Sequence, residues 1–288
     1  MTLANSSSGE VQNWRYRAIS HGNILPIRAF NDNYIWLISL VNQAGEPRAL
    51  VVDPGDAAPV LQTLQALHLT LAGILITHHH ADHTGGIGDL KAAFPDAVVY
   101  GPRKCANTFI SRRFDHGDTL TIPDLDFSCG VIEVPGHTLD HNAYFCERVG
   151  NDERPVLFCG DTLFAGGCGR IFEGTPALMQ QSLARLAELP PATLVYCAHE
   201  YTLSNLRFAT AAEPDNAATV ARLEEAEAIR EQDLETVPST LGIEHATNPF
   251  LRVNEETVRR VLASRTKQEG DPVERFAALR QWKNEYRG

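Results

Sequence analysis

The sequence has no C-x-x-C pair, no run of Lys or Arg residues, and no stretch of 18 uncharged apolar residues. The missing apolar stretch argues against a membrane-spanning helix. The missing basic run, together with a net charge of −11, argues against nucleic acid or an anionic membrane as a partner. Residues 1–10 lack the basic start and apolar core of a secretory signal, so we expect a cytoplasmic protein. The six cysteines lie mostly in apolar runs, which predicts reduced, packed thiols.

The chain has 288 residues, enough for about two domains of ordinary size. With 43% hydrophobic and 21% charged residues, its composition is typical of a soluble globular protein. A G-x-S-x-G sequence, which would present a nucleophilic serine, is also missing. We therefore expect a folded enzyme that does not acylate a serine.

Short apolar runs alternate with Gly, Asp and Pro turns up to about His199, and each run ends in a polar residue. This pattern is typical of buried strands, which we expect at residues 49–55, 72–78, 97–102, 131–137, 156–161 and 193–199. Helices are expected between them at 59–67, 86–94 and 175–189. Strands and helices mixed in this way predict an α/β layered domain.

After His199 the pattern becomes helical, with segments expected at 203–212, 216–235, 254–263 and 272–286. The last segment begins with Asp271, Pro272 and Glu274, which is a capping-box arrangement. Residues 236–252 contain two prolines and a glycine, so we expect a structured loop there. These segments predict a helical C-terminal domain.

The densest motif is T-H-H-H-A-D-H-T-G-G, residues 77–86, directly after an expected strand. It offers four potential metal ligands, His78, His80, Asp82 and His83. Alternate residues of an extended turn face the same way, so His78 and His80 can meet at one cation while Asp82 and His83 turn to a second. His79 is out of phase and is expected to point away. Imidazole and carboxylate ligands suit zinc, iron or manganese.

Three further polar residues follow expected strands directly, namely His137, Asp161 and His199. Strand ends present side chains from a rigid sheet, so these residues can supply the remaining ligands of two metal ions. One carboxylate is able to bridge both ions. His141 is a candidate for supporting the ligands.

The H-x-H-x-D-H motif with separate His, Asp and His residues at strand ends resembles the metallo-β-lactamase superfamily. Asp53, in V-V-D-P-G, resembles the aspartate that begins this series. The chain is more closely similar to the hydroxyacylglutathione hydrolases, the glyoxalase II family, from about residue 24 to residue 286. This resemblance includes residues 29–36, 160–170, 197–202 and 248–252.

The resemblance implies a four-layer αββα sandwich over residues 22–199 and a helical substrate-binding domain over residues 200–288, with residues 1–21 as an N-terminal tail. It also implies two divalent metal ions per chain, for which we expect zinc, with iron or manganese as alternatives. One ion would be held by His78, His80 and His137, and the other by Asp82, His83 and His199. Asp161 and a hydroxide would bridge the two ions. Asp82 and Asp161 are the implied catalytic carboxylates, and Asp53 is implied to support the ligands.

Substrate contacts implied by the resemblance are Arg170, Phe172, Tyr201, Arg280 and Lys283. Arg280 and Lys283 are three apart on the last expected helix, so their side chains are neighbours that could clamp a carboxylate. The chain departs from the family at three of its positions. Phe172 stands where many relatives have Tyr, Arg170 where Lys is common, and Asp140 where Gly is frequent.

The implied activity is hydrolysis of S-2-hydroxyacylglutathione thioesters, such as S-D-lactoylglutathione to D-lactate and glutathione, in the second step of methylglyoxal detoxification. The bridging hydroxide would attack the thioester carbonyl. The alternative enzyme is a glutathione persulfide dioxygenase with a single iron. A metal-stabilised binding module without turnover is a third possibility. We expect a monomer whose partner is a small-molecule substrate.

Overall fold

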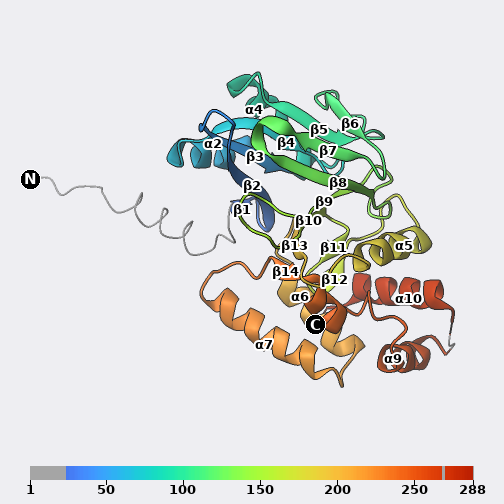
Figure 1. The fold of residues 1–288 in the computed structure, drawn as a ribbon. Coiled ribbons are helices and arrows are strands. Elements are labelled where there is room, and N and C mark those ends of the chain that lie inside the picture. Colours follow the sequence, from blue (N-terminus) through green and yellow to red (C-terminus); the bar gives the residue numbers. More distant parts are fainter. Residues whose placement is uncertain (1–23, 268–269, 288) are drawn as a thin grey trace, which may run out of the picture.

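The computed structural model describes residues 24–267 and 270–287 of the chain (Figure 1). The expected N-terminal tail, residues 1–21, lies outside the described residues. Two six-stranded sheets stack in the upper part of Figure 1, and most of the C-terminal helices lie below them. No helix in the described part of the chain combines the length and the apolar character needed to cross a membrane.

The first sheet has the strand order β1-β2-β3-β4-β5-β6. Its strands are β1 (Ile24–Ala29), β2 (Asn33–Val41), β3 (Pro47–Val52), β4 (Thr70–Leu75), β5 (Val98–Pro102) and β6 (Arg112–Phe114). The strands from β3 to β6 pair in parallel, whereas β1, β2 and β3 pair antiparallel. Because parallel strands end at the same edge of a sheet, the segments that follow β3 and β4 meet there.

The second sheet has the order β14-β13-β10-β9-β8-β7. Its strands are β7 (Thr119–Ile122), β8 (Phe127–Glu133), β9 (Asn142–Cys146), β10 (Val156–Gly160), β13 (Leu194–Cys197) and β14 (Ser239–Thr240). A separate hairpin pairs β11 (Leu163–Phe164) with β12 (Gly167–Cys168). The strands β10 and β13 are parallel, so the segments after them also share an edge.

Helices cover the outer faces of both sheets. In the sandwich they are α2 (Ala57–Ala66), α3 (Ala81–Thr84), α4 (Ile87–Ala93), a 3-10 turn η1 (Pro123–Leu125) and α5 (Pro176–Ala187). In the C-terminal part they are α6 (Thr202–Ala212), α7 (Ala217–Glu231), α8 (Leu241–Thr247), α9 (Glu256–Thr266) and α10 (Pro272–Glu285). The predicted αββα sandwich with a C-terminal helical region is thus confirmed.

The hydrophobic core follows from the alternation of side chains along the strands. In β2, Ile35 and Leu37 face the cluster under α2 and α4, while Trp36 and Ile38 face the cluster between the sheets. This second cluster continues without a break into residues of α6 and α10. Within the described residues, all six cysteines are buried and free, as expected.

The structure confirms the six expected strands and the seven expected helices, with ends shifted by a few residues. Helix α10 begins with the predicted capping box of Asp271 and Glu274. The expectation of a loop over residues 236–252 was wrong, because the segment holds β14 and the short helix α8. The Thr240 hydroxyl caps α8 by accepting a hydrogen bond from the Ile243 amide, which stabilises a helix of only seven residues.

Candidate metal centre and substrate cavity

The loop after β4 carries the predicted histidine motif and is fixed by Asp53. The Asp53 carboxylate accepts hydrogen bonds from the Thr77 amide at 2.8 Å and the Thr77 hydroxyl at 2.7 Å. It also lies 3.0 Å from His83 Nδ1. These contacts hold the motif at the edge of the sheet. His78 and His83 are completely buried, and the Nε2 atom of each ring has no hydrogen bond. The predicted supporting role of Asp53 therefore has a geometric basis.

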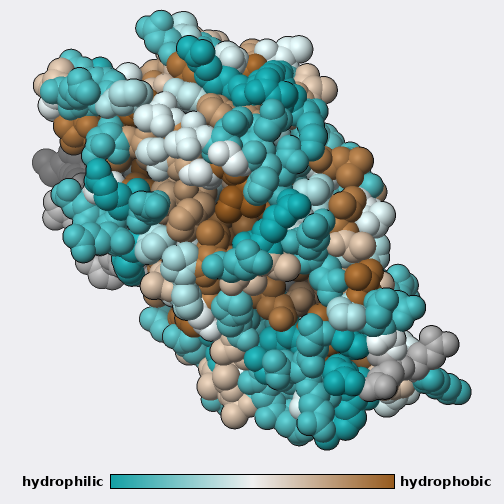
Figure 2. Space-filling view, turned by 45° about the vertical axis from the view of Figure 1, so that its right-hand side comes forward, coloured by the Kyte–Doolittle hydropathy of each residue, from teal (hydrophilic) through white to brown (hydrophobic). Residues whose placement is uncertain are grey.

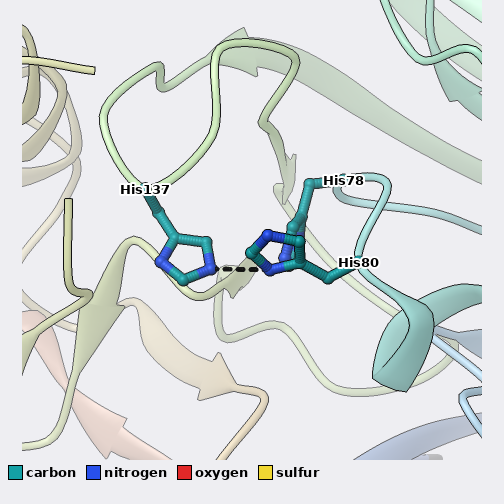
Figure 3. Close-up of side chains that lie close together, drawn as sticks. All are labelled: His78, His80 and His137. Carbon is teal, nitrogen blue, oxygen red and sulfur yellow. Dashed lines mark hydrogen bonds between the residues drawn. The ribbon is translucent and has the colours of Figure 1, made fainter. Parts of the chain in front are cut away.

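His78, His80 and His137 come together as the first ligand group (Figure 3). His80 Nδ1 lies 3.1 Å from His137 Nε2, and the His78 ring centroid is 4.7 Å from that of His80. His137 Nδ1 donates a hydrogen bond of 2.8 Å to the Arg170 carbonyl, so its other nitrogen faces the group. Two loops far apart in the sequence thus present three imidazoles to one point.

Asp82, His83 and His199 form the second group. The Asp82 carboxylate lies 3.5 Å from His83 Nε2 and 3.6 Å from His199 Nε2. His199 Nδ1 is 2.8 Å from the Asp32 carboxylate, and Asn33 donates a 3.0 Å hydrogen bond to Asp82. Each ligand of this group therefore has an outer partner that fixes its orientation.

Asp161 lies between the two groups. Its Oδ1 is 3.5 Å from His83 Nε2 and 3.3 Å from His199 Nε2, whereas its Oδ2 is 3.4 Å from His137 Nε2. One carboxylate therefore faces ligands of both groups. This is the arrangement that a bridging role requires.

Three buried atoms at this centre, among the residues that the structure describes, have no hydrogen bond: His78 Nε2, His83 Nε2 and Asp161 Oδ1. Buried polar atoms without partners are costly and uncommon in proteins. Imidazole and carboxylate donors that converge in this way fit divalent metal ions. The described residues therefore fit a pair of metal ions.

The electrostatics of the centre match this interpretation. Burial lowers the pKa of His78 well below its usual value, so the ring is neutral and keeps a lone pair for a metal. Burial alone would raise the pKa of Asp161, but His83 and His199 outweigh it and hold that pKa well below the usual range. Asp161 is thus ionised and ready to act as a ligand.

The sequence pointed to Asp53 and His141 as supporting residues, but it gave no role to Asp32 or Asn33. His141 is buried and stacks on His78, with ring centroids 4.6 Å apart. Its Nε2 accepts a 3.1 Å hydrogen bond from the Asp161 amide, so one ring supports ligands of both groups. Asp32 and Asn33 lie in the A-F-N-D-N-Y-I-W segment, and that segment was the only signal that could have indicated them.

Replacing Asp53 with alanine is expected to weaken metal binding and stability together. The variant leaves the Thr77 amide, the Thr77 hydroxyl and His83 Nδ1 without their acceptor. We expect a loss of about 1 to 3 kcal/mol in the free energy of unfolding and about a 10- to 100-fold loss of metal affinity. Chemical denaturation and chelator competition measure the two effects. Asp56→Ala, which removes only the cap of α2, is the control and should leave metal affinity unchanged.

A cavity of about 590 Å³ extends from the metal-ligand groups to α10. Its residues include His80, Asp82, His137, Asp161 and His199 from the two ligand groups and Arg170, Phe172, Tyr201, Arg280 and Lys283 from the predicted substrate contacts. Figure 2 shows hydrophobic surface in a band across the middle of one face, with hydrophilic surface above and below it. The structure thus gathers all five predicted substrate contacts around one cavity.

The basic end of the cavity is not a solvated helix face. Arg280 is only 6% exposed, and its Nη1 donates a 2.8 Å hydrogen bond to the Cys168 carbonyl. Lys283 donates hydrogen bonds to the carbonyl and the hydroxyl of Ser204 at 2.8 and 3.0 Å. Burial, with Arg280 and Arg170 nearby, lowers the pKa of Lys283 to about 8. A region of such concentrated positive charge favours an anion.

Aromatic side chains line the cavity beside the metal ligands. The Tyr201 ring stacks on His199, with centroids 4.8 Å apart and planes 3° from parallel. Phe172 is 64% exposed and meets His80 and His137 edge-on, at centroid distances of 5.7 and 5.2 Å. Burial and the nearby Asp32 carboxylate raise the pKa of Tyr201, so its hydroxyl stays protonated.

Comparison with known families agrees with this geometry. The profile of the family described as "Metallo-beta-lactamase superfamily" matches residues 33–199. The solved structure of ETHE1 from Myxococcus xanthus is 24% identical and has a TM-score of 0.58, over 90% of this chain and 97% of that one. With its sandwich fold and its clustered His and Asp ligands, the chain is a metallo-β-lactamase superfamily protein.

The C-terminal part defines the family more narrowly. The profile described as "Hydroxyacylglutathione hydrolase C-terminus" matches residues 200–286. A hydroxyacylglutathione hydrolase of Albidiferax ferrireducens is 51% identical over 91% of this chain and 99% of its own length. One of Hahella chejuensis is 50% identical with the same coverage of both chains. The chain belongs to the hydroxyacylglutathione hydrolase family.

Proposed function

We propose that the protein hydrolyses S-2-hydroxyacylglutathione thioesters, releasing glutathione and a 2-hydroxy acid. S-D-lactoylglutathione is the expected substrate, and D-lactate is then the acid formed, in the second step of methylglyoxal detoxification. The observation that carries this proposal is the single cavity that joins the ligand groups to the basic end of α10. The cavity can hold the anionic glutathione part of the substrate at its basic end and the thioester beside the metal-ligand groups.

The proposal places two metal ions, which we expect to be zinc, at the centre. His78, His80 and His137 would hold one ion, Asp82, His83 and His199 the other, and Asp161 would contact both. Such a pair supplies a nucleophile from water at neutral pH and charge stabilisation at the thioester oxygen. The neutral His78 and the ionised Asp161 are in the protonation states that ligands need.

The residues of the cavity would position the substrate. Arg280, Lys283 and Arg170 offer charged donors to the carboxylates of the glutathione part. Tyr201, whose hydroxyl remains protonated, can donate a hydrogen bond near the metal ligands. Phe172 covers His80 and His137 with an apolar edge, which limits access of water from that side. Binding therefore holds the thioester next to the metal centre.

The cationic residues of the cavity explain how a chain with a negative net charge can bind an anionic substrate. The chain carries a net charge of −11, yet Arg170, Arg280, Lys283 and Arg287 all line one cavity. Charge focused in a cleft acts on a ligand more strongly than the net charge of the whole molecule. Substrate attraction therefore depends on these few residues.

Above pH 8 the Michaelis constant is expected to rise. The pKa of Lys283 is lowered to about 8, so its ammonium group is present below that pH and is lost as the pH rises through it. Without the charge, the substrate carboxylate loses one of its partners. Initial rates between pH 6.5 and 9.5 would measure this effect. In Lys283→Ala the rise should disappear, and an unchanged rise would contradict the role of Lys283.

Elemental analysis beside two activity assays tests the proposed function. We expect about two metal ions per chain and hydrolysis of S-D-lactoylglutathione, measured by the release of glutathione. Glutathione persulfide with oxygen electrode detection is the second assay. About one iron per chain with oxygen uptake would overturn the proposal in favour of a persulfide dioxygenase. Two bound metals without turnover of either substrate would favour a binding module.

The family matches favour thioester hydrolysis over the dioxygenase. The relatives at about half identity are named hydroxyacylglutathione hydrolases, and the profile of their C-terminal region spans residues 200–286. The similarity to ETHE1, at 24% identity, concerns the fold alone. The second ligand group, with Asp82 and His199, also favours a two-metal centre.

A further inference from the structure

His79 lies between two metal-ligand candidates in the sequence but points away from them, as its position in the motif predicts. It is half-exposed and contacts two carboxylates. His79 Nδ1 is 3.0 Å from Asp140 Oδ1, and His79 Nε2 is 3.4 Å from Glu173 Oε1. Although ligand atoms of these three residues lie within 4.8 Å of one another, each ring nitrogen of His79 contacts a different carboxylate, and a single cation would take only one of the two nitrogens. The imidazole instead forms a link between two carboxylates.

Each carboxylate is itself tied to the segment that carries His137. Asp140 Oδ1 accepts a 2.7 Å hydrogen bond from the Thr138 hydroxyl. Glu173 Oε2 accepts a 2.8 Å hydrogen bond from the Leu139 amide. The link through His79 thus ends on residues that directly follow His137.

The segment with Glu173 is bound to the same place through its backbone. The amides of Phe172 and Glu173 both donate to the His137 carbonyl, at 3.1 and 3.3 Å. The Arg170 carbonyl in turn accepts the hydrogen bond from His137 Nδ1. Three segments, residues 78–80, 137–141 and 170–174, are therefore closed into one ring of contacts by His79.

His80 is the ligand candidate that depends most on this ring. His78, His83, His137 and His199 each have a ring nitrogen bonded to a residue outside the ligand groups: the Thr77 hydroxyl, the Asp53 carboxylate, the Arg170 carbonyl and the Asp32 carboxylate. Among the described residues, the His80 ring has no such bond, and its only nitrogen contact is with His137. The His80 carbonyl accepts hydrogen bonds from the His83 and Thr84 amides, and the His80 ring is held by edge-on contacts with the rings of His78, His137 and Phe172.

We propose that His79, Asp140 and Glu173 form a clamp that positions His80 against His137 for the first metal ion. The clamp also gives Asp140 a role, because its carboxylate joins His79 to the Thr138 hydroxyl. All three are positioning residues that act through His80 and His137. The inference rests on the assignment of His78, His80 and His137 as ligands of one ion and is independent of the substrate.

Zinc affinity tests the clamp without reference to turnover. Chelator competition on the full chain should resolve two zinc ions. In His79→Ala and Asp140→Gly, one ion should bind about 10 to 100 times more weakly while the other is unchanged. Asp140→Asn, which keeps an oxygen acceptor for His79, should restore most of the affinity. His116→Ala, which removes an exposed histidine that is hydrogen-bonded to the Glu133 amide and not to the clamp, is the control.

Two further measurements separate positioning from general stability. Thermal unfolding of zinc-free His79→Ala should match that of the zinc-free parent, because the His79 side chain is 39% exposed. The double variant His79→Ala/Glu173→Ala should lose no more affinity than the weaker-binding single variant, since both act through one link. Unchanged affinity for both ions in His79→Ala would overturn the proposal. Equal losses for both ions, with lower zinc-free stability, would also overturn it.

Discussion

Replacing Asp161 with alanine should remove both metal retention and hydrolysis while the chain remains folded. Asp161 contributes an oxygen to each ligand group, so its loss affects two ions and not one. We expect metal affinity and turnover each to fall by at least about a hundredfold. Metal content after dialysis, together with initial rates at saturating substrate, measures the two effects.

An exposed carboxylate provides the matched control for this experiment. Asp124→Ala should keep both metals and the parental turnover, because Asp124 lies at the surface in the turn η1. Circular dichroism would show that both variants are folded. If Asp161→Ala retained two metals and near-parental turnover, its bridging role would be wrong.

The second large effect concerns the basic end of the cavity. Arg280 and Lys283 are expected to contact a part of the substrate that does not change during the reaction, so their loss should raise KM and leave kcat nearly unchanged. Each lost charge-assisted contact is worth about 1.5 to 3 kcal/mol, which is roughly a 10- to 100-fold rise in KM. Because Arg280 also donates a buried hydrogen bond to the Cys168 carbonyl, Arg280→Ala should lower stability as well. Lys283→Ala should lower it less, because the hydrogen bonds of Lys283 to Ser204 are exposed.

Steady-state kinetics at low and high ionic strength would measure this contribution. Salt screens attraction between cations and an anionic substrate, so parental KM should rise with salt. In Arg280→Ala/Lys283→Ala it should rise less. Arg207→Ala removes a cation of α6 that pairs with Glu227 at the surface, and it should behave like the parent. If KM is unchanged by salt, by Arg280→Ala, by Lys283→Ala and by the double variant, the assignment of this end of the cavity to glutathione is wrong.

Local sequence patterns predicted the elements that carry the ligands, because each ligand follows a buried apolar run or belongs to one dense motif. They could not predict which loops meet. Asp32 and Asn33 contact His199 and Asp82, which are distant in the sequence, and only the strand order brings them together. The contact of His79 with Glu173 also joins residues that are distant in the sequence, so local patterns could not predict it.

Local sequence patterns also could not predict the ends of helices and strands where tertiary contacts or backbone geometry determine those ends. The sequence predicted a helix to Glu235, yet α7 ends at Glu231, and Asp233 adopts a left-handed conformation with φ of 55°. Helix α8 was missed because its seven residues include Gly242 and are too few for a clear helical period. Such short elements depend on their cap and on the residues packed against them.

The continuous hydrophobic core between the sheets and the C-terminal helices affects the order in which the nascent chain can fold on the ribosome. All metal-ligand candidates precede α6 in the chain, whereas Arg280 and Lys283 belong to α10. Because synthesis proceeds from the N-terminus, the nascent sandwich can gather its metal ligands while the apolar partners of α10 remain uncovered. Docking of α10 then buries this surface and completes the cavity, so the proposed metal ligands can come together before the proposed substrate contacts of α10 are in place.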